Sequence, residues 1–303
     1  MKLMQPRARL QRVPTSKTLL DKAVTRQGDV LTCNGVVLQT KSHVLNKEGA
    51  MTFSHTAIYQ SPTIQEALCE VSFRPQNDHP WTALTPLKFY QTIQSDFPNV
   101  EEVPNSVLQI KIGADEAASS AVPKFSTLLR FRHASRPLML QLSENRIIVN
   151  CLGNYQGWVR MREDIQYAWQ KISAVSHPSV VTRIGLRYIN RIEREFERQT
   201  LGEWLTPTEY VPRAALSSLP GFTSQLHVRV DATNRISVIL GEPETAKNLL
   251  PPFIFDIDRI SEEEMSSEGD LLLERIDAMH QEIRNIFFNA KGAKLEKLLR
   301  GEL

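Results

Sequence analysis

The chain has 303 residues, of which 41% are hydrophobic and 23% are charged, as expected for a soluble globular protein with one large core or two small ones. No apolar run is long enough to span a membrane, and the N-terminus has no signal-peptide pattern. The three cysteines, Cys33, Cys69 and Cys151, are far apart and form no Cys-x-x-Cys pair. This excludes a disulfide framework and a zinc knuckle, and we expect a cytoplasmic protein.

The net charge of +2 conceals an uneven distribution. Residues 1–50 carry nine basic and three acidic residues, so residues 51–303 carry 27 basic and 31 acidic ones. The basic character of the chain therefore belongs to its first part. The mildly acidic remainder argues against nonspecific nucleic-acid binding, which depends on an excess of Lys and Arg.

Residues 1–55 form a basic leader without a sustained period, apart from one short candidate strand at 35–39. The leader is interpreted as a basic arm for nucleic acid or membrane, or as a disordered tail. A third interpretation rests on Lys47-Glu48-Gly49, which the purine run of a bacterial ribosome-binding sequence encodes. Met51 follows at the spacing of a start codon, so we expect natural translation to begin there and residues 1–50 to be an over-extended gene prediction.

The first half of the body, residues 56–178, begins with an alternating strand over 67–74, followed by an amphipathic helix over 84–97 that Pro98 stops. A loop is predicted next. Three short strands at 128–133, 138–142 and 146–151 form an antiparallel meander, and a helix beginning near Trp158 closes this half.

The second half, residues 179–303, repeats this order more loosely. It is predicted to contain a long strand at 180–192, a short helical piece near 201–205, three strands at 222–230, 235–240 and 252–260, and a closing helix from about Ser267. Gly292 is expected to divide that helix. The fold class is therefore α+β, with a largely antiparallel sheet, helices on one face and a possible duplicated β-α-β-β-β-α unit in one globular body.

Three motifs carry a resemblance to a known family. They are 61–73 (SPTIQEALCEVSF), Tyr155-Gln156-Gly157-Trp158, and 183–192 (RIGLRYINRI). The chain from about Ile58 resembles a sporadically distributed bacterial and archaeal protein family of unknown function. The resemblance implies no activity, and the family's patchy distribution suggests an accessory or defence-associated role.

Motifs of common enzymes are missing from the sequence. It has no Gly-rich phosphate loop, no Gly-x-Ser-x-Gly elbow and no His-Glu-x-x-His, and its seven histidines are dispersed. We therefore assign no catalytic residue and expect no cofactor. His280, on the closing helix, is interpreted as a packed or half-exposed side chain.

The most distinctive positive feature is an arginine row on strand 180–192. Because side chains alternate along a strand, Arg183, Arg187 and Arg191 share one face, while Tyr188 and Asn190 point to the other. Arginines pair bidentately with carboxylates and phosphates. One interpretation is that the row binds an anionic ligand or partner, with candidate ligand-binding residues Arg183, Arg187, Tyr188 and Asn190. Alternatively, it forms internal ion pairs with Glu70 and Asp256, which is the commoner role. Arg191 and Arg194 are expected to be solvated.

Asp256 and Asp258 lie on one face of strand 252–260. Two such carboxylates can hold a divalent cation through their oxygens, although pairing of Asp256 with an arginine is the simpler explanation. Three further arginines, Arg130, Arg132 and Arg136, would favour a nucleic-acid groove if they shared a surface with the arginine row. Tyr155, Trp158, Trp169 and Tyr188 are interpreted as core or pocket aromatics.

Three functions follow from these observations. The leading one is a non-enzymatic protein that binds an unknown protein partner or a small anionic ligand through Arg183 and Arg187. The second is a divalent-metal-dependent enzyme on a phosphate-bearing substrate, with Asp256 and Asp258 as ligands. The third is a nucleic-acid-binding protein; no membrane partner is expected.

Overall fold

The structure is a computed structural model that describes residues 30–33, 36–39, 59, 62–110, 121–218, 221–242 and 250–303. The chain divides into two compact units, Met1–Thr56 and Ala57–Leu303. In the first unit, β1 (Val30–Cys33) pairs antiparallel with β2 (Val36–Gln39). The expected start at Met51 lies outside the described residues.

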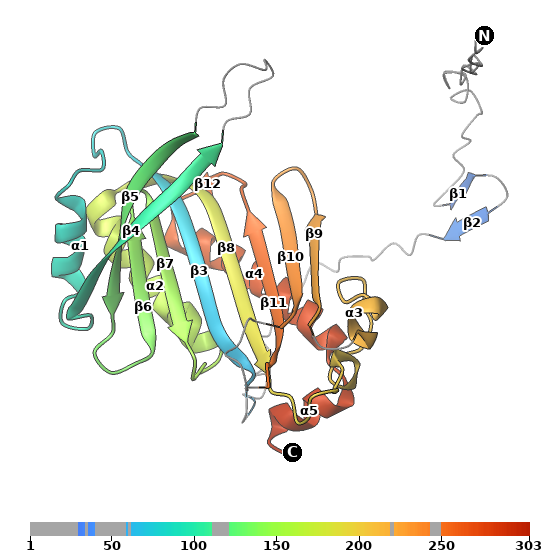
Figure 1. The fold of residues 1–303 in the computed structure, drawn as a ribbon. Coiled ribbons are helices and arrows are strands. Elements are labelled where there is room, and N and C mark those ends of the chain that lie inside the picture. The colour runs from blue at the N-terminus through green and yellow to red at the C-terminus, as the bar shows by residue number, and fades with distance from the viewer. Residues whose placement is uncertain are drawn as a thin grey trace, which may run out of the picture. The chain divides into compact units, whose positions relative to one another are not determined.

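The second unit is an α+β fold built on one antiparallel sheet (Figure 1). Its strands follow the order β4-β5-β6-β7-β3-β8-β11-β10-β9, and the short β12 pairs with the first residues of β8. Their bounds are β3 (Ile64–Pro75), β4 (Asn99–Ile110), β5 (Ala121–Arg132), β6 (Leu138–Ser143), β7 (Arg146–Leu152), β8 (Pro178–Ile192), β9 (Thr223–Arg229), β10 (Asn234–Gly241), β11 (Phe253–Ser261) and β12 (Met265–Ser266).

The centre of the sheet is the pairing of β3 with β8. Both strands alternate as the sequence predicts, so that one side of each is apolar. Those apolar side chains are buried: Ala67, Cys69, Val71 and Phe73 on β3, and Ile184, Leu186, Tyr188 and Ile192 on β8.

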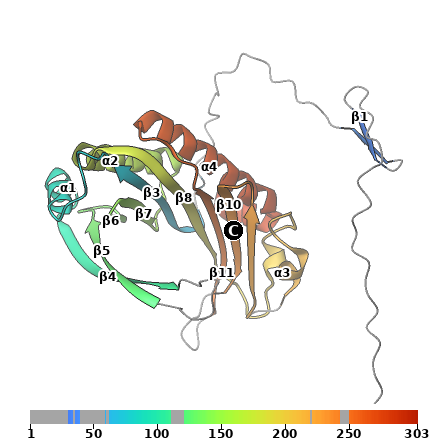
Figure 2. The same cartoon turned by 90° about the horizontal axis from the view of Figure 1, so that it is seen from above.

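Helices cover this apolar side. Helices α2 (Trp158–Ser176) and α4 (Gly269–Ala290) lie across the sheet, and α1 (Thr85–Ile93) packs beside α2 (Figures 1 and 2). Each long helix buries a stripe of apolar side chains at three- and four-residue spacing. In α2 this stripe includes Met161, Ile165, Trp169 and Ile172. The opposite side of the sheet curves inward and carries no helix in the described part of the chain (Figure 2).

The two halves arrange their strands differently. The first half has four strands after α1 because β4 occupies the segment predicted as a loop. Its charged and polar sequence, with Pro104, suits an edge strand and hides the strand period. The second half has η1 (Leu201–Glu203) and α3 (Arg213–Ser217), then β9, β10 and β11. Duplication of a common unit stays a prediction.

The closing helix is divided as expected at Gly292, where α4 gives way to α5 (Ala293–Arg300). The glycine N–H donates to the Trp204 carbonyl at 2.8 Å. A Cβ at this position would lie 2.7 Å from the same oxygen, so the close approach requires glycine. Among the helices that the structure describes, none is long and apolar enough to cross a membrane.

Candidate functional site

The side of the sheet opposite α2 and α4, here called the open face, carries the arginine row. Strand alternation and cross-strand register gather charged and polar side chains there from five neighbouring strands. These are Arg146 and Asn150 on β7, Glu66 and Glu70 on β3, Arg183, Arg187 and Arg191 on β8, Asp256 and Asp258 on β11, and Arg235 and Ser237 on β10.

Arg187 forms a bidentate pair with Asp256. Its Nε lies 2.9 Å from Oδ1, and one terminal nitrogen lies 2.5 Å from Oδ2. The carboxylate raises the pKa of the guanidinium, mainly through these hydrogen bonds. Two charge-assisted bonds in one plane fix the orientation of the guanidinium.

Arg183 is held in a similar way by Glu70, with which it forms a close ion pair. Arg146 lies 4.0 Å from the other oxygen of Glu70, and Glu262 lies 4.0 Å from the Nε of Arg183. Arg191, at the end of the strand, is exposed and pairs with Glu193 at 2.5 Å. The first two arginines of the row are therefore fixed by carboxylates of neighbouring strands.

The arginines are more exposed than the acids that hold them. The side chain of Arg187 is 37% exposed and that of Asp256 is 6% exposed; for Arg183 and Glu70 the values are 28% and 17%. The acids thus lie beneath the guanidinium groups. Since a guanidinium has five N–H donors, each arginine keeps donors that its acid does not use.

Asp258 differs from its neighbours on the open face. It lies directly across from Arg187 in the strand register, yet it makes no hydrogen bond or ion pair with any described residue. Burial raises the pKa of its carboxyl to about 6, and the adjacent Asp256 adds to the rise, while Arg187 and Arg183 oppose it. A carboxyl with a raised pKa beside fixed guanidinium groups makes this part of the face a candidate functional site.

Two further polar atoms of the open face have no partner among the described residues. They are the Oδ1 of Asn150 and the Nε of Arg130, both buried. Asn150 is only 4% exposed, and its amide nitrogen donates to Glu66 at 2.7 Å. Buried polar groups normally have a hydrogen-bond partner, and both atoms are closed off from solvent, so an internal water is the partner that would satisfy them.

Tyr188 and Asn190 do not join the arginines. Both are buried on the helix-covered side, where the Tyr188 hydroxyl lies 3.0 Å from that of Tyr155. The amide of Asn190 donates to the Phe255 carbonyl at 3.1 Å and accepts from Thr63 at 3.0 Å. These contacts connect β8 to Thr63, to Tyr155 and to β11. Neither side chain lies on the open face.

Of the other arginines named from the sequence, some lie on the open face and others do not. By the register of β5 and β6, Arg130 and Arg132 belong to the open face, whereas Arg136 pairs with Asp164 on α2. The prediction that Arg194 is solvated is wrong. Its side chain is 1% exposed, donates to the Pro251 carbonyl at 2.6 Å and pairs with Glu242, because the chain folds back over it after β8.

The Tyr155-Gln156-Gly157-Trp158 motif contributes to the contact between α2 and α4. The rings of Trp158 on α2 and His280 on α4 stack with centroids 4.0 Å apart, and the indole N–H donates to Asp277 at 2.9 Å. Burial lowers the pKa of His280 to about 4. His280 is thus a packed neutral ring, and the motif is explained by helix packing. Trp169 is a core residue.

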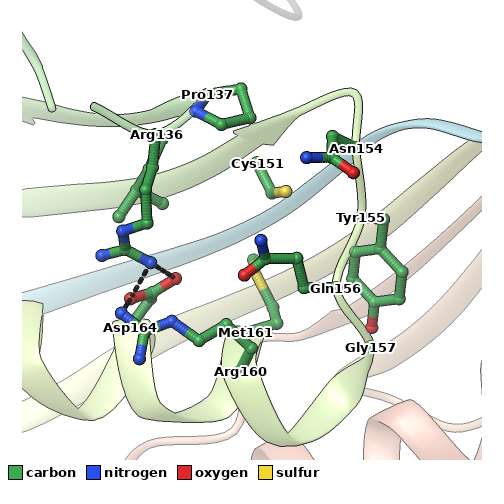
Figure 3. A pocket seen from close by; sticks show the side chains of 11 residues that line it. Arg136, Pro137, Cys151, Asn154, Tyr155, Gln156, Gly157, Arg160, Met161 and Asp164 are labelled. Atoms are coloured by element: carbon green, nitrogen blue, oxygen red, sulfur yellow. Dashed lines mark hydrogen bonds and ion pairs between the residues drawn. The ribbon is translucent and has the colours of Figure 1, made fainter. Parts of the chain in front are cut away.

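A small cavity lies beside this motif, between the start of α2 and the turn before β6 (Figure 3). Its volume is about 20 Å³, which is room for one water molecule. Arg136 extends into it and makes two 3.0 Å contacts with Asp164, and Arg160 contacts the same carboxylate at 3.3 Å. Arg160 also pairs with Glu163 at 3.0 Å, so the two arginines here are matched by two acids.

The metal-site interpretation finds little support in the geometry. Both oxygens of Asp256 accept from Arg187, so a cation would have to displace the guanidinium. Within the described ranges, no group of three or more His, Cys, Asp or Glu residues is arranged to hold a metal ion.

Comparison with known proteins gives no functional assignment. No protein-family model matches the chain, and no curated protein matches it significantly. The resemblance to a family of unknown function therefore stays a prediction.

Proposed function

We propose that this chain is a non-enzymatic, cytoplasmic binding protein that takes an anionic ligand or partner group on the open face of its sheet. The observation that carries the proposal is the layering of charge: carboxylates lie beneath, and the guanidinium groups of Arg183 and Arg187 lie above them with unused donors.

Two physical arguments support binding over a purely structural role. A buried ion pair contributes little net stability, since desolvation of both charges offsets their attraction. Fixing an arginine before a ligand arrives, in contrast, lowers the entropy lost on binding.

Nucleic acid is the second candidate, because Arg130, Arg132, Arg183 and Arg187 share the open face. The stacking platform of a single-strand binder is missing from the described part of this face, since its strand positions carry no Phe, Tyr or Trp. We therefore favour a small anionic group over a polynucleotide.

The test is a calorimetric titration with inorganic pyrophosphate near the pKa of Asp258, where its repulsion of an anion is reduced. We expect saturable binding that weakens about tenfold or more in Arg187→Gln and in Arg183→Gln, since each charge-assisted hydrogen bond contributes about 1.5–3 kcal/mol. Arg300→Gln, at an exposed helical arginine, is the matched control and should bind as the wild type does.

Binding of a labelled single-stranded oligonucleotide in the same buffer tests whether the open face binds nucleic acid instead of a small anion. Tight binding whose affinity falls steeply with salt would favour nucleic acid. If pyrophosphate binding is equal in wild type and both open-face variants, the proposed function is wrong.

A further inference from the structure

Building on the proposed function, we infer that Asp258 selects a zwitterionic ligand: an amino acid or short peptide whose carboxylate binds Arg183 or Arg187 and whose ammonium group binds Asp258.

The first argument is the isolation of Asp258 among paired acids. Glu66 accepts from Asn150, Glu70 pairs with Arg183, and Asp256 pairs with Arg187. Asp258 is half-buried and makes no such contact with any described residue. A carboxylate that is partly withdrawn from water without a hydrogen-bonded partner is destabilised, and a ligand that supplies a cation would relieve this.

Asp258 lies close enough to Arg187 for one small ligand to contact both side chains. Asp258 and Arg187 are register partners on adjacent strands, so their Cβ atoms are about 4.5–5.5 Å apart. Both side chains project from the same face. A ligand with neighbouring ammonium and carboxylate groups can therefore contact both at once, whereas a simple anion meets repulsion from Asp258.

The third argument concerns the surroundings of the charges. Half-buried apolar side chains alternate with the charged ones on the same face: Leu68 on β3, Ile189 on β8, Ile239 on β10 and Ile254 on β11. Such a mixture favours an amphipathic molecule.

The experiment compares four ligands by calorimetry at about pH 7.5: L-leucine, N-acetyl-L-leucine, L-leucinamide and L-leucyl-L-leucine. The second lacks the ammonium charge and the third lacks the carboxylate. We expect wild type to prefer L-leucine or the dipeptide over both blocked forms by about tenfold or more, the size expected for one charge-assisted bond. The stronger of the two unblocked ligands identifies free amino acid or peptide as the source.

Asp258→Asn provides the decisive variant, since it keeps the shape and removes the charge. It should bind N-acetyl-L-leucine as tightly as L-leucine, and its melting temperature reports whether it folds. Glu163→Gln, at an exposed acid on the far side of α2, is the matched control and should keep the wild-type preference. Lowering the pH through about 6 should also reduce the preference, as Asp258 becomes protonated among Arg187, Arg183, Asp256 and Glu70.

Equal binding of L-leucine and its acetylated form by wild type would overturn the inference, as would an unchanged preference in Asp258→Asn. Failure of all four ligands to bind would also overturn it. The pyrophosphate titration judges the proposed function separately, because that titration needs only the arginines.

Discussion

Removing Arg187 should destabilise the protein more than removing the charge of Asp256. In Arg187→Met the carboxylate of Asp256, which is almost fully buried, loses both of its hydrogen bonds. Leaving one charge of a fully buried pair without its partner costs about 3–5 kcal/mol. Arg187 is partly exposed, so water will reach the site, and we expect a loss of about 2–3 kcal/mol.

The reverse change should cost less. In Asp256→Asn, the guanidinium of Arg187 can recover hydration through its exposed edge, and the amide oxygen still accepts one bond. We expect a loss of about 1 kcal/mol. The double variant Arg187→Met/Asp256→Asn leaves no buried charge, so it should be more stable than the sum of the two single losses implies.

Urea unfolding at neutral pH measures these differences, and a loss of 2 kcal/mol lowers the melting temperature of a unit of this size by about 4–8 °C. Arg300→Met, at an exposed pair, should stay within about 0.5 kcal/mol of wild type. Strict additivity in the double variant, or a greater loss in Asp256→Asn than in Arg187→Met, would refute the reasoning.

Three further outcomes are expected. Asp258→Asn should stabilise the fold by about 1–3 kcal/mol above pH 6 and hardly at all near pH 4, because the pKa of this half-buried carboxyl is raised from 3.8 to about 6 and its charged form opposes folding. Equal shifts of the melting temperature at both pH values would contradict this. The wild-type protein should lose stability between about pH 6.5 and pH 4, because burial lowers the pKa of His280 to about 4 and protonation of the ring favours unfolding. His280→Phe should lessen this loss, and an unchanged acid unfolding transition in the variant would contradict the prediction. Gly292→Ala should cost about 1–3 kcal/mol through collision with the Trp204 carbonyl, whereas Gly269→Ala, with its nearest contact at 3.7 Å, should be nearly neutral in the same thermal melts.

The central strands were predictable because their alternation is visible in the chain. Apolar residues recur at every second position of β3 and β8, which predicts both faces, including the arginine row. Strand β4 escaped prediction because an edge strand does not need a buried face, and its charged residues resemble a loop. The break between α4 and α5 was predictable because Gly292 interrupts the sequence of the closing helix.

The site was less accessible to sequence reasoning, because it depends on contacts between distant segments. The alternation of the strands predicts Glu70 and Asp256 as acids near the arginines. In the structure Glu70 pairs with Arg183 and Asp256 pairs with Arg187. No local pattern distinguishes Asp258, without a partner, from Asp256 two residues earlier. Arg194 follows the row in sequence but is buried by a segment near Pro251, and the stacking of Trp158 on His280 joins separate helices.

The most direct test of anion binding on the open face follows the arginine Nε–H signals by NMR while inorganic pyrophosphate is added. We predict that the signals of Arg183 and Arg187 move most and saturate together, while those of Arg136 and Arg160 beside the small cavity of Figure 3 stay in place. Shifts concentrated at Arg136 and Arg160, or spread evenly over all arginines, would contradict it.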